Sequence, residues 1–275
     1  MPFNPDRINI HELTIEEPER RAEVFFDAEK DITKEDWKGM EGKLEEYRRE
    51  NKWDKFSQQA MRMKILDPNQ DLNIDLIARN GIREILEEDR KSCVWNGFAS
   101  QATEMKMLGI DQELNIDQVA LQGTREMMEG YRQRMGRDRG WDSFSWMAMN
   151  LKIIDPTQDL NLDQVAWHGM RDTLEKDRQQ KSWADFSWGA VKIKILDPNQ
   201  DLNLDQEAWQ GMRDYLEKQR ENGDKWGNLS WQLANMKILV AEKVEVTENG
   251  IELTMPKKRE SLGSDAPPIP EIKKF

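Results

Sequence analysis

The chain has 275 residues, of which 53 are acidic and 41 basic, giving a formal net charge of −12. With 37% hydrophobic and 34% charged residues, it has the composition of a folded globular protein rather than a disordered one. The acidic balance disfavours nonspecific binding to nucleic acid, because the phosphate backbone would be repelled on average. No apolar run approaches the ~18 residues of a membrane span, and the first residues lack the apolar core of a secretory signal. A single cysteine, Cys93, excludes an internal disulfide, so we expect a cytoplasmic protein with no membrane partner.

A repeat of roughly forty residues runs through most of the chain, a period typical of solenoids built from helix pairs. The segment Asp197-Pro-Asn-Gln-Asp-Leu-Asn-Leu-Asp205 recurs at 155–163 and 67–75, and in degraded form at 111–117. A Trp-x-Gly-Met block follows it, and a Trp-x-x-Phe block comes next, as at Trp183 and Phe186. We place five units near 31–70, 71–112, 113–158, 159–200 and 201–243.

Each unit is predicted to fold as two helices. In the first, Trp167, Met170 and Leu174 are spaced three and four residues apart and therefore lie on one helical stripe. Acidic residues precede this helix in four units and are natural N-caps, namely Asp75, Asp117, Asp163 and Asp205. The fold class that follows is an all-α solenoid of five helix pairs, occupying residues 21–243.

Glycine recurs inside the first helix of every unit, at Gly39, Gly81, Gly123, Gly169 and Gly211. A glycine in mid-helix costs about 0.5–1 kcal/mol relative to alanine. Its retention in all five units predicts a close approach between helices, where any Cβ would clash.

The two ends of the chain differ from the repeats. Residues 1–20 carry three prolines and no periodicity, so we expect an extended arm. Residues 244–255 alternate around Asn249-Gly250, which predicts a β-hairpin pairing Val246 with Leu253, and we expect it to cover the open end of the helix stack. Residues 256–275 contain Lys and Pro clusters and are predicted to form a flexible tail.

The blocks Trp-x-Gly-Met, Trp-x-x-Phe-Ser and Lys-Ile-Leu-x-Pro resemble those of uncharacterised bacterial tandem-helical-repeat proteins. The resemblance covers roughly Asp31 to Met255. It implies a helical-repeat fold and no known activity.

Acidic and amide side chains alternate in the loops between units, as the early ligands of a calcium loop do. They are Asp67, Asn69, Asp71, Asn73 and Asp75 in one loop, and Asp197, Asn199, Asp201, Asn203 and Asp205 in another. The turn glycine and the bidentate glutamate of an EF-hand are missing, since Leu72 and Ala78 stand there. We favour turns and helix caps, and keep a calcium-responsive protein as an alternative.

Basic residues also recur at fixed positions of the repeat. One set is Lys64, Lys106, Lys152, Lys194 and Lys237, and the other is Arg48, Arg90, Arg132, Arg178 and Arg220. Such ladders could follow the backbone of single-stranded or ribosomal RNA. Both sets fall in the last turn of a helix, where cations offset the helix dipole, so we favour a structural role and expect no nucleic acid partner.

Groups that could carry catalysis are scarce. His168 occupies a position that is polar in the other units, His11 lies in the predicted arm, and Cys93, which could open a helix, has no partner near it in sequence. No glycine-rich phosphate loop, serine elbow or His-Glu metal motif is present. We therefore expect neither an enzyme nor a cofactor.

Three of the 11 tryptophans fall outside the predicted core stripe, about 140° around the helix from it. These are Trp146, Trp188 and Trp231, and the neighbouring position in angle carries Ile153, Ile195 and Ile238. Two interpretations stay open. The six side chains are buried between repeats, or they form an exposed strip on the concave face that anchors a partner. Because an extended repeat surface comes without a catalytic constellation, we expect a non-catalytic interaction scaffold that uses its repeat surface, its termini or both to bind an unidentified protein. The oligomeric state is left open.

Overall fold

The computed structural model describes residues 31–110, 116–133, 140–222 and 226–256. Within these ranges it contains ten helices and one two-stranded antiparallel sheet. The outer helices are α3 (Lys34–Arg49), α5 (Leu76–Lys91), α7 (Gln118–Gln133), α9 (Gln164–Gln179) and α11 (Gln206–Glu221). The inner helices are α4 (Trp53–Leu66), α6 (Trp95–Met107), α8 (Gly140–Ile154), α10 (Trp183–Leu196) and α12 (Trp226–Val240). The strands are β1 (Lys243–Thr247) and β2 (Gly250–Thr254). The predicted all-α solenoid of helix pairs with a hairpin cap is confirmed, whereas the predicted arm and almost all of the tail lie outside the described residues.

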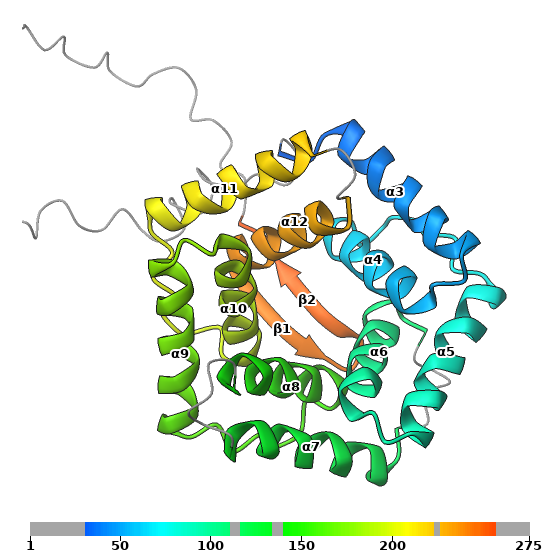
Figure 1. Ribbon diagram of the computed structural model, residues 1–275, viewed down its shortest axis with the longest axis horizontal. Helices are drawn as coiled ribbons and strands as arrows, with labels where there is room; N and C mark the ends of the chain where they lie inside the picture. The colour runs from blue at the N-terminus through cyan, green and yellow to red at the C-terminus, as the bar shows by residue number, and fades with distance from the viewer. Residues whose placement is uncertain (1–30, 111–115, 134–139, 223–225, 257–275) are drawn as a thin grey trace, which may run out of the picture.

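The five helix pairs form a closed ring rather than an open superhelix. Figure 1 shows the outer helices as the sides of a pentagon, with the inner helices within it. The last inner helix, α12, packs against both α3 and α4 of the first unit. The solenoid therefore has no free end, because its last unit covers the flank of its first.

The recurring glycines receive tryptophan rings from the preceding unit. A Cβ built on Gly81 would lie 2.3 Å from the indole of Trp53, and one on Gly211 would lie 2.0 Å from that of Trp183. Gly39 meets Trp226 at 2.2 Å in the same way, although the two residues belong to the first and last units. The predicted close approach is thus between an outer helix and a neighbouring indole ring, and it is repeated where the ring closes.

The indole that fills each glycine notch also packs on its own inner helix. In the first four units it stands edge-on against the phenylalanine three residues later, with ring centroids between 5.4 Å (Trp141–Phe144) and 6.1 Å (Trp95–Phe98) apart. These phenylalanines are at most 1% exposed and form the middle of the core between the two helical layers. Each tryptophan therefore joins the core of its own unit to the outer helix of the next.

The predicted N-cap residues start the outer helices and also receive a cation from the unit before. The Asp75 carboxylate accepts the backbone N–H of Ala78 at 3.0 Å and pairs with Arg48 at 2.5 Å. The same pattern joins Arg90 to Asp117, Arg132 to Asp163 and Arg178 to Asp205. The first outer helix uses a capping box of Thr33 and Asp36, and Arg220 of the last unit pairs with Asp36 at 2.7 Å. The arginine ladder thus joins consecutive outer helices all the way around the ring.

The lysine ladder makes the corresponding contact between inner helices. The Nζ atom of Lys152 donates to the carbonyl of Leu196 at 2.7 Å, at the carboxyl end of the next inner helix. Lys106 and Lys194 reach the next unit in the same way, and Lys237 closes the ring by donating to the carbonyl of Leu66 at 2.6 Å. Lys64 differs, since it donates to Gln70 of the loop that follows its own helix. These contacts satisfy carbonyl groups that a helix end leaves without partners.

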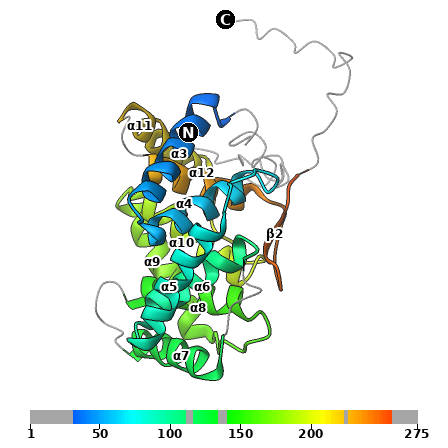
Figure 2. The same ribbon diagram turned by 90° about the vertical axis from the view of Figure 1, so that its right-hand side faces the viewer.

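The β-hairpin covers one end of the space enclosed by the ring, not the end of a stack (Figure 2). It packs on α6, α8 and α10. The predicted pairing of Val246 with Leu253 is wrong, because Val246 pairs with Ile251 and the turn consists of residues 248 and 249. Gly250 instead begins β2 with φ 107°, and a Cβ there would lie 2.9 Å from the sulfur of Met107. Glycine is required at this position by the positive φ, and the close approach of Met107 adds to that requirement.

Candidate ligand cavity inside the ring

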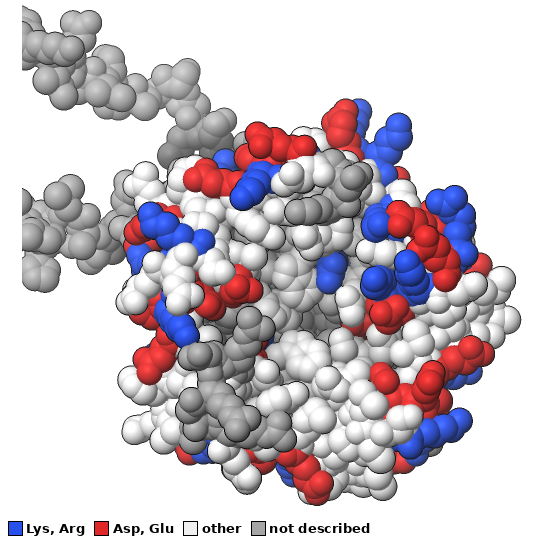
Figure 3. All heavy atoms as spheres, in the orientation of Figure 1, with Lys and Arg blue, Asp and Glu red and all other residues white. Residues whose placement is uncertain are grey.

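The inner helices enclose a cavity of about 180 Å³ in the middle of the ring. A tryptophan lies at or next to the start of each inner helix. The residues five, eight, nine and twelve positions after it line the cavity, and we call these positions the fifth, eighth, ninth and twelfth registers. Among the described residues, Ile251 of the hairpin is the one lining residue outside the helices. Figure 3 shows the face of the ring away from the hairpin, with most charged side chains at the periphery and uncharged surface toward the middle. The cavity is therefore a product of ring closure, since all five units contribute to it.

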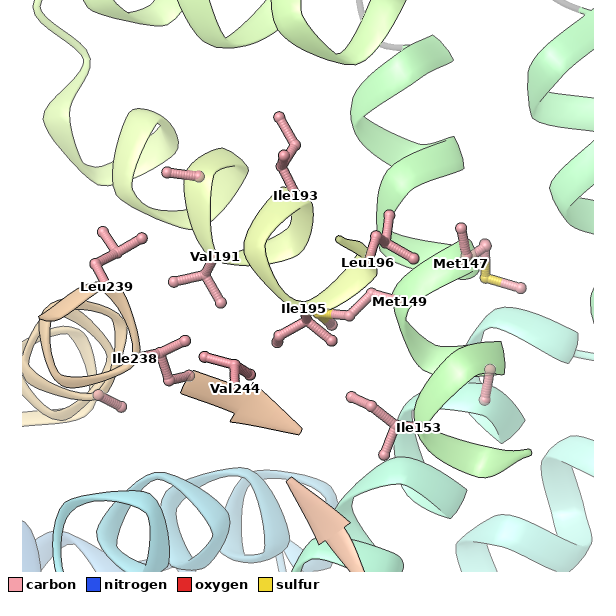
Figure 4. Close-up of a cluster of buried hydrophobic side chains, with 14 of the residues drawn as sticks. Met147, Met149, Ile153, Val191, Ile193, Ile195, Leu196, Ile238, Leu239 and Val244 are labelled. Atoms are coloured by element: carbon pink, nitrogen blue, oxygen red, sulfur yellow. The ribbon is translucent and has the colours of Figure 1, made fainter. Parts of the chain in front are cut away.

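The sequence-predicted tryptophans and isoleucines all line this cavity. Trp146, Trp188 and Trp231 occupy the fifth register and are half-buried. Ile153, Ile195 and Ile238 occupy the twelfth register and are 1–3% exposed. Figure 4 shows these three isoleucines around Val244 of β1, so the hairpin covers their end of the cavity. The tryptophans keep an exposed fraction and mark the other end of the cavity.

Two of the tryptophans contact each other with their rings tilted by 54°, and each has a cationic side chain over its ring. The ring centroids of Trp188 and Trp231 lie 4.2 Å apart. The guanidinium carbon of Arg62 lies 4.4 Å from the Trp231 ring centroid, and Nζ of Lys192 lies 5.5 Å from that of Trp188. This row spans α4, α12 and α10, so it crosses the junction between the first and last units. Cation–π contacts of this kind hold the aromatic wall in place and leave little ring face for a second cation.

The ninth register is polar in every unit and was not among the sites predicted from the sequence. Its members are Arg62, Glu104, Asn150, Lys192 and Asn235, which we call the polar girdle. Four of them line the cavity, and Lys192, 1% exposed, pairs instead with Asp142. Nδ2 of Asn235 donates to Ser187 at 3.1 Å. Aligning the repeats by their tryptophans would have revealed this register. All five units carry a polar residue there, although the position faces the core, and core packing alone would favour apolar residues.

Arg62 leaves one edge of its guanidinium group without an acceptor. Its Nη1 donates to the carbonyl of Gly227 at 3.1 Å, whereas its Nε is buried and has no partner among the described residues. Burial lowers the pKa of Arg62 to about 10, so the group remains charged at neutral pH. An unpaired buried donor costs about 1–3 kcal/mol, and an acceptor that entered the cavity would recover it.

Glu104 lies beside this arginine in the girdle and is 2% exposed. It accepts hydrogen bonds from the hydroxyls of Ser57 at 2.5 Å and Ser100 at 2.9 Å. Burial raises the pKa of the Glu104 carboxyl to about 7, against the opposing effect of the two hydroxyl donors and the charge of Arg62. The net charge inside the cavity therefore changes near neutral pH.

Two further polar atoms of the lining residues are buried without a partner in the described part of the chain. They are Nδ2 of Asn150 and Oγ1 of Thr103. Since an amide nitrogen can only donate, Asn150 adds a second unmatched donor to that of Arg62. The cavity thus combines apolar walls with a surplus of hydrogen-bond donors.

The acidic loops of the calcium alternative use their oxygens on their own backbone. Oδ1 of Asp67 accepts from the N–H of Asn69 and Oδ1 of Asp71 from that of Asn73, both at 2.9 Å. The loop containing Asp197 and Asp201 repeats these bonds. No group of three or more His, Cys, Asp or Glu side chains within the described ranges could hold a metal ion. These contacts are those of turns and caps, and calcium binding itself stays untested.

The other reactive side chains lie away from the cavity. His168 is exposed on α9, with Nε2 3.3 Å from Asp172. Cys93 is exposed in the loop before α6 at φ 55°, so it does not open that helix, which begins at Trp95. The corresponding loop positions in other units, Asn51 and Lys181, have the same left-handed backbone. The conformation of Cys93 is therefore a feature of the repeat.

None of the helices in the described ranges combines the length and the apolar character that crossing a membrane requires. Comparison of the chain with protein-family models, curated proteins and solved structures gives no match. The resemblance to bacterial tandem-helical-repeat proteins stays a prediction.

Proposed function

We propose that this protein is a non-catalytic binding protein that holds a small, largely apolar ligand in the central cavity of its ring. The observation that carries the proposal is a cavity that all five inner helices line, with apolar walls and few polar groups. Cavities of this character are the usual sites for small ligands in proteins. An apolar cavity of about 150 Å³ accepts a ligand the size of benzene, so one of about 180 Å³ has room for a slightly larger molecule.

The arrangement of the titratable groups favours binding over catalysis. Lys192 pairs with Asp142, Arg62 lies over the ring of Trp231, and Glu104 accepts from two serine hydroxyls. No nucleophile paired with a base stands among these contacts. We also place the protein in the cytoplasm, which its single cysteine favours.

A cavity-filling variant tests the proposal. Ala234 lies in the eighth register, where the first and third units carry Met61 and Met149, so Ala234→Met is compatible with the repeat. We expect small aromatic and aliphatic probes to bind the wild type in saturation-transfer NMR, and Ala234→Met to abolish the signal. Ala184→Met, on α10 outside the lining residues, should leave binding unchanged. Binding that survives Ala234→Met would contradict a cavity site.

An interaction scaffold for a protein partner is a second candidate, favoured by apolar side chains on the outside of the ring. Ile77, Val119 and Val165 occupy the second position of three consecutive outer helices and are 67%, 67% and 53% exposed. The first and last units carry Glu35 and Glu207 there. We expect the triple change to glutamate to weaken partner capture without loss of helicity. Capture unaffected by the triple variant would contradict this surface.

The RNA alternative receives no support from the contacts of the ladders. Arg178 pairs with Asp205, and Lys152 donates to the Leu196 carbonyl, so both side chains are occupied between units. We accordingly propose no nucleic acid partner. A gel shift with random single-stranded RNA tests this, because electrostatic binding would appear at low salt and fall steeply as salt is added.

A further inference from the structure

We propose that the ligand of the central cavity is a carboxylate on a small apolar body, bound through the free edge of Arg62. This inference rests on the proposed function and narrows its ligand to one chemical class. The apolar body would contact the walls formed by the fifth and twelfth registers. The carboxylate would lie at the polar girdle.

The geometry of Arg62 is the first ground for this class. Nε and Nη2 form one edge of the guanidinium group, and neither donates to any described residue, whereas Nη1 is used on Gly227. Two parallel N–H donors match the two oxygens of a carboxylate, which makes this a strong and oriented pair. The contact with Trp231 and the hydrogen bond to Gly227 restrict the side chain before a ligand binds, so less conformational freedom is lost on binding.

The surplus of donors in the girdle is the second ground. Asn150 offers an unpaired N–H beside the cavity, whereas both oxygens of Glu104 accept from serine hydroxyls. A ligand that carries acceptors therefore satisfies more buried groups than one that carries donors. A carboxylate supplies acceptors and no donor.

The charges around the aromatic wall are the third ground, because they disfavour the opposite ligand class. A three-tryptophan wall can bind a quaternary ammonium or other cation. Here Arg62 lies over Trp231 and Lys192 over Trp188, so a cationic ligand would meet protein cations on two of the three rings. A cationic ligand is therefore disfavoured relative to an anionic one of the same size.

The carboxylate should bind more tightly at pH 6 than at pH 8. The charged or titratable groups that act on Glu104 are Arg62 and Asp54 of α4, and the hydroxyls of Ser57 on α4 and Ser100 on α6 contact it directly. Below its pKa of about 7 Glu104 is neutral, and Arg62 leaves the site positive. Above that pH a second carboxylate in the same cavity repels the ligand.

The experiment compares matched acids and neutral isosteres by titration calorimetry on the full-length chain. The two pairs are phenylacetate with phenylacetamide, and hexanoate with hexanamide. We expect at least one acid to bind at least tenfold more tightly than its amide at pH 6, and to lose at least threefold in affinity at pH 8. Arg62→Met should remove the preference for the acid and keep the amide's affinity. Arg171→Met, which removes the same charge from an exposed position on α9, should change neither.

The outcomes separate the two proposals. Amides that bind as tightly as the acids overturn the carboxylate inference and leave the small-ligand function standing. An acid preference that survives Arg62→Met overturns the assignment of the site to this arginine. No binding by either pair overturns both. A folded state of Arg62→Met is checked by far-UV circular dichroism, and Arg62→Lys provides a second variant that keeps the charge and loses the two-donor edge.

Discussion

Trp226, the first residue of the last inner helix, fills a notch that Gly39 leaves in the first outer helix, nearly two hundred residues earlier in the chain. A Cβ at residue 39 would lie 2.2 Å from this indole ring. The same relationship joins Gly211 to Trp183 within the body of the repeat, where the corresponding distance is 2.0 Å. The junction between the first and last units is therefore the fifth copy of the packing geometry that joins the other units. The cavity depends on this junction.

Replacing Gly39, at the junction between the first and last units, should destabilise the ring. We expect Gly39→Ala to lower the free energy of unfolding by about 1–3 kcal/mol, because the methyl group overlaps the ring of Trp226 in a packed core. Gly42→Ala in the same helix is the matched control, since a Cβ there meets nothing within 4 Å. The control should raise stability by about 0.5–1 kcal/mol through helix propensity. Urea denaturation measures both, and equal effects at the two sites would contradict the notch.

The ion pair between Arg220 and Asp36, which joins the last unit to the first, should contribute more to stability than the equivalent pairs between other units. Arg220 pairs with Asp36, whose side chain is 3% exposed, whereas the partner of Arg178, Asp205, is 45% exposed. We expect Arg220→Gln to cost about 2 kcal/mol, because it leaves a buried carboxylate without its cation. Arg178→Gln should cost at most about 1 kcal/mol, as exposed pairs do. A double-mutant cycle with Asp36→Asn tests the assignment, and a coupling energy near zero would refute it.

The stability of the protein should fall as pH rises through neutrality because of Glu104. Its pKa is raised from the usual 4.5 to about 7 in the folded protein, so the folded state binds this proton more tightly than the unfolded state. The resulting stabilisation is fully present below about pH 4.5 and is lost as pH rises through 7. Between pH 5 and pH 8 the loss from this group amounts to about 2–3 kcal/mol.

Glu104→Gln isolates this contribution, because glutamine keeps the shape of the side chain and cannot ionise. We expect the variant to gain stability relative to the wild type as pH rises from 5 to 8, measured by chemical denaturation at each pH. Subtracting the two profiles removes the effect of other groups that titrate in this range, such as Asp177, whose pKa is raised to about 6. Parallel profiles for the two proteins would show that Glu104 does not titrate there.

The repeat units and their helix pairs could be predicted from the sequence because each depends on local patterns. The stripe of Trp167, Met170 and Leu174 and the cap at Asp163 describe one helix without reference to the rest of the chain. Ring closure could not be predicted in the same way, since it depends on a small rotation between units that accumulates over five of them. A signal was nevertheless present. Gly39 keeps its notch in the first unit, where an open solenoid would place no tryptophan before it.

The candidate site was only half visible in the sequence. The positions of Trp188 and Ile195 identified a special face of the inner helices, but whether that face was open or enclosed depended on closure. Arg62 and Glu104 were missed because each differs from its counterparts in the other units. Their shared feature is polarity at one register, which becomes informative only when that register is known to face a cavity.

The closed ring is tested most directly by comparing two spin-label distances between outer helices. Lys38, His168 and Gln210 are exposed and occupy the same position of α3, α9 and α11. With Cys93 replaced by asparagine, which the first unit carries at the equivalent Asn51, labels are placed on 38 and 210 or on 168 and 210. A closed ring predicts the same narrow distance distribution for both pairs in pulsed electron resonance, although residues 38 and 210 are far apart in the chain. A longer and broader distance distribution for the 38–210 pair than for the 168–210 pair would show that the ring is open. The proposed cavity would then not exist.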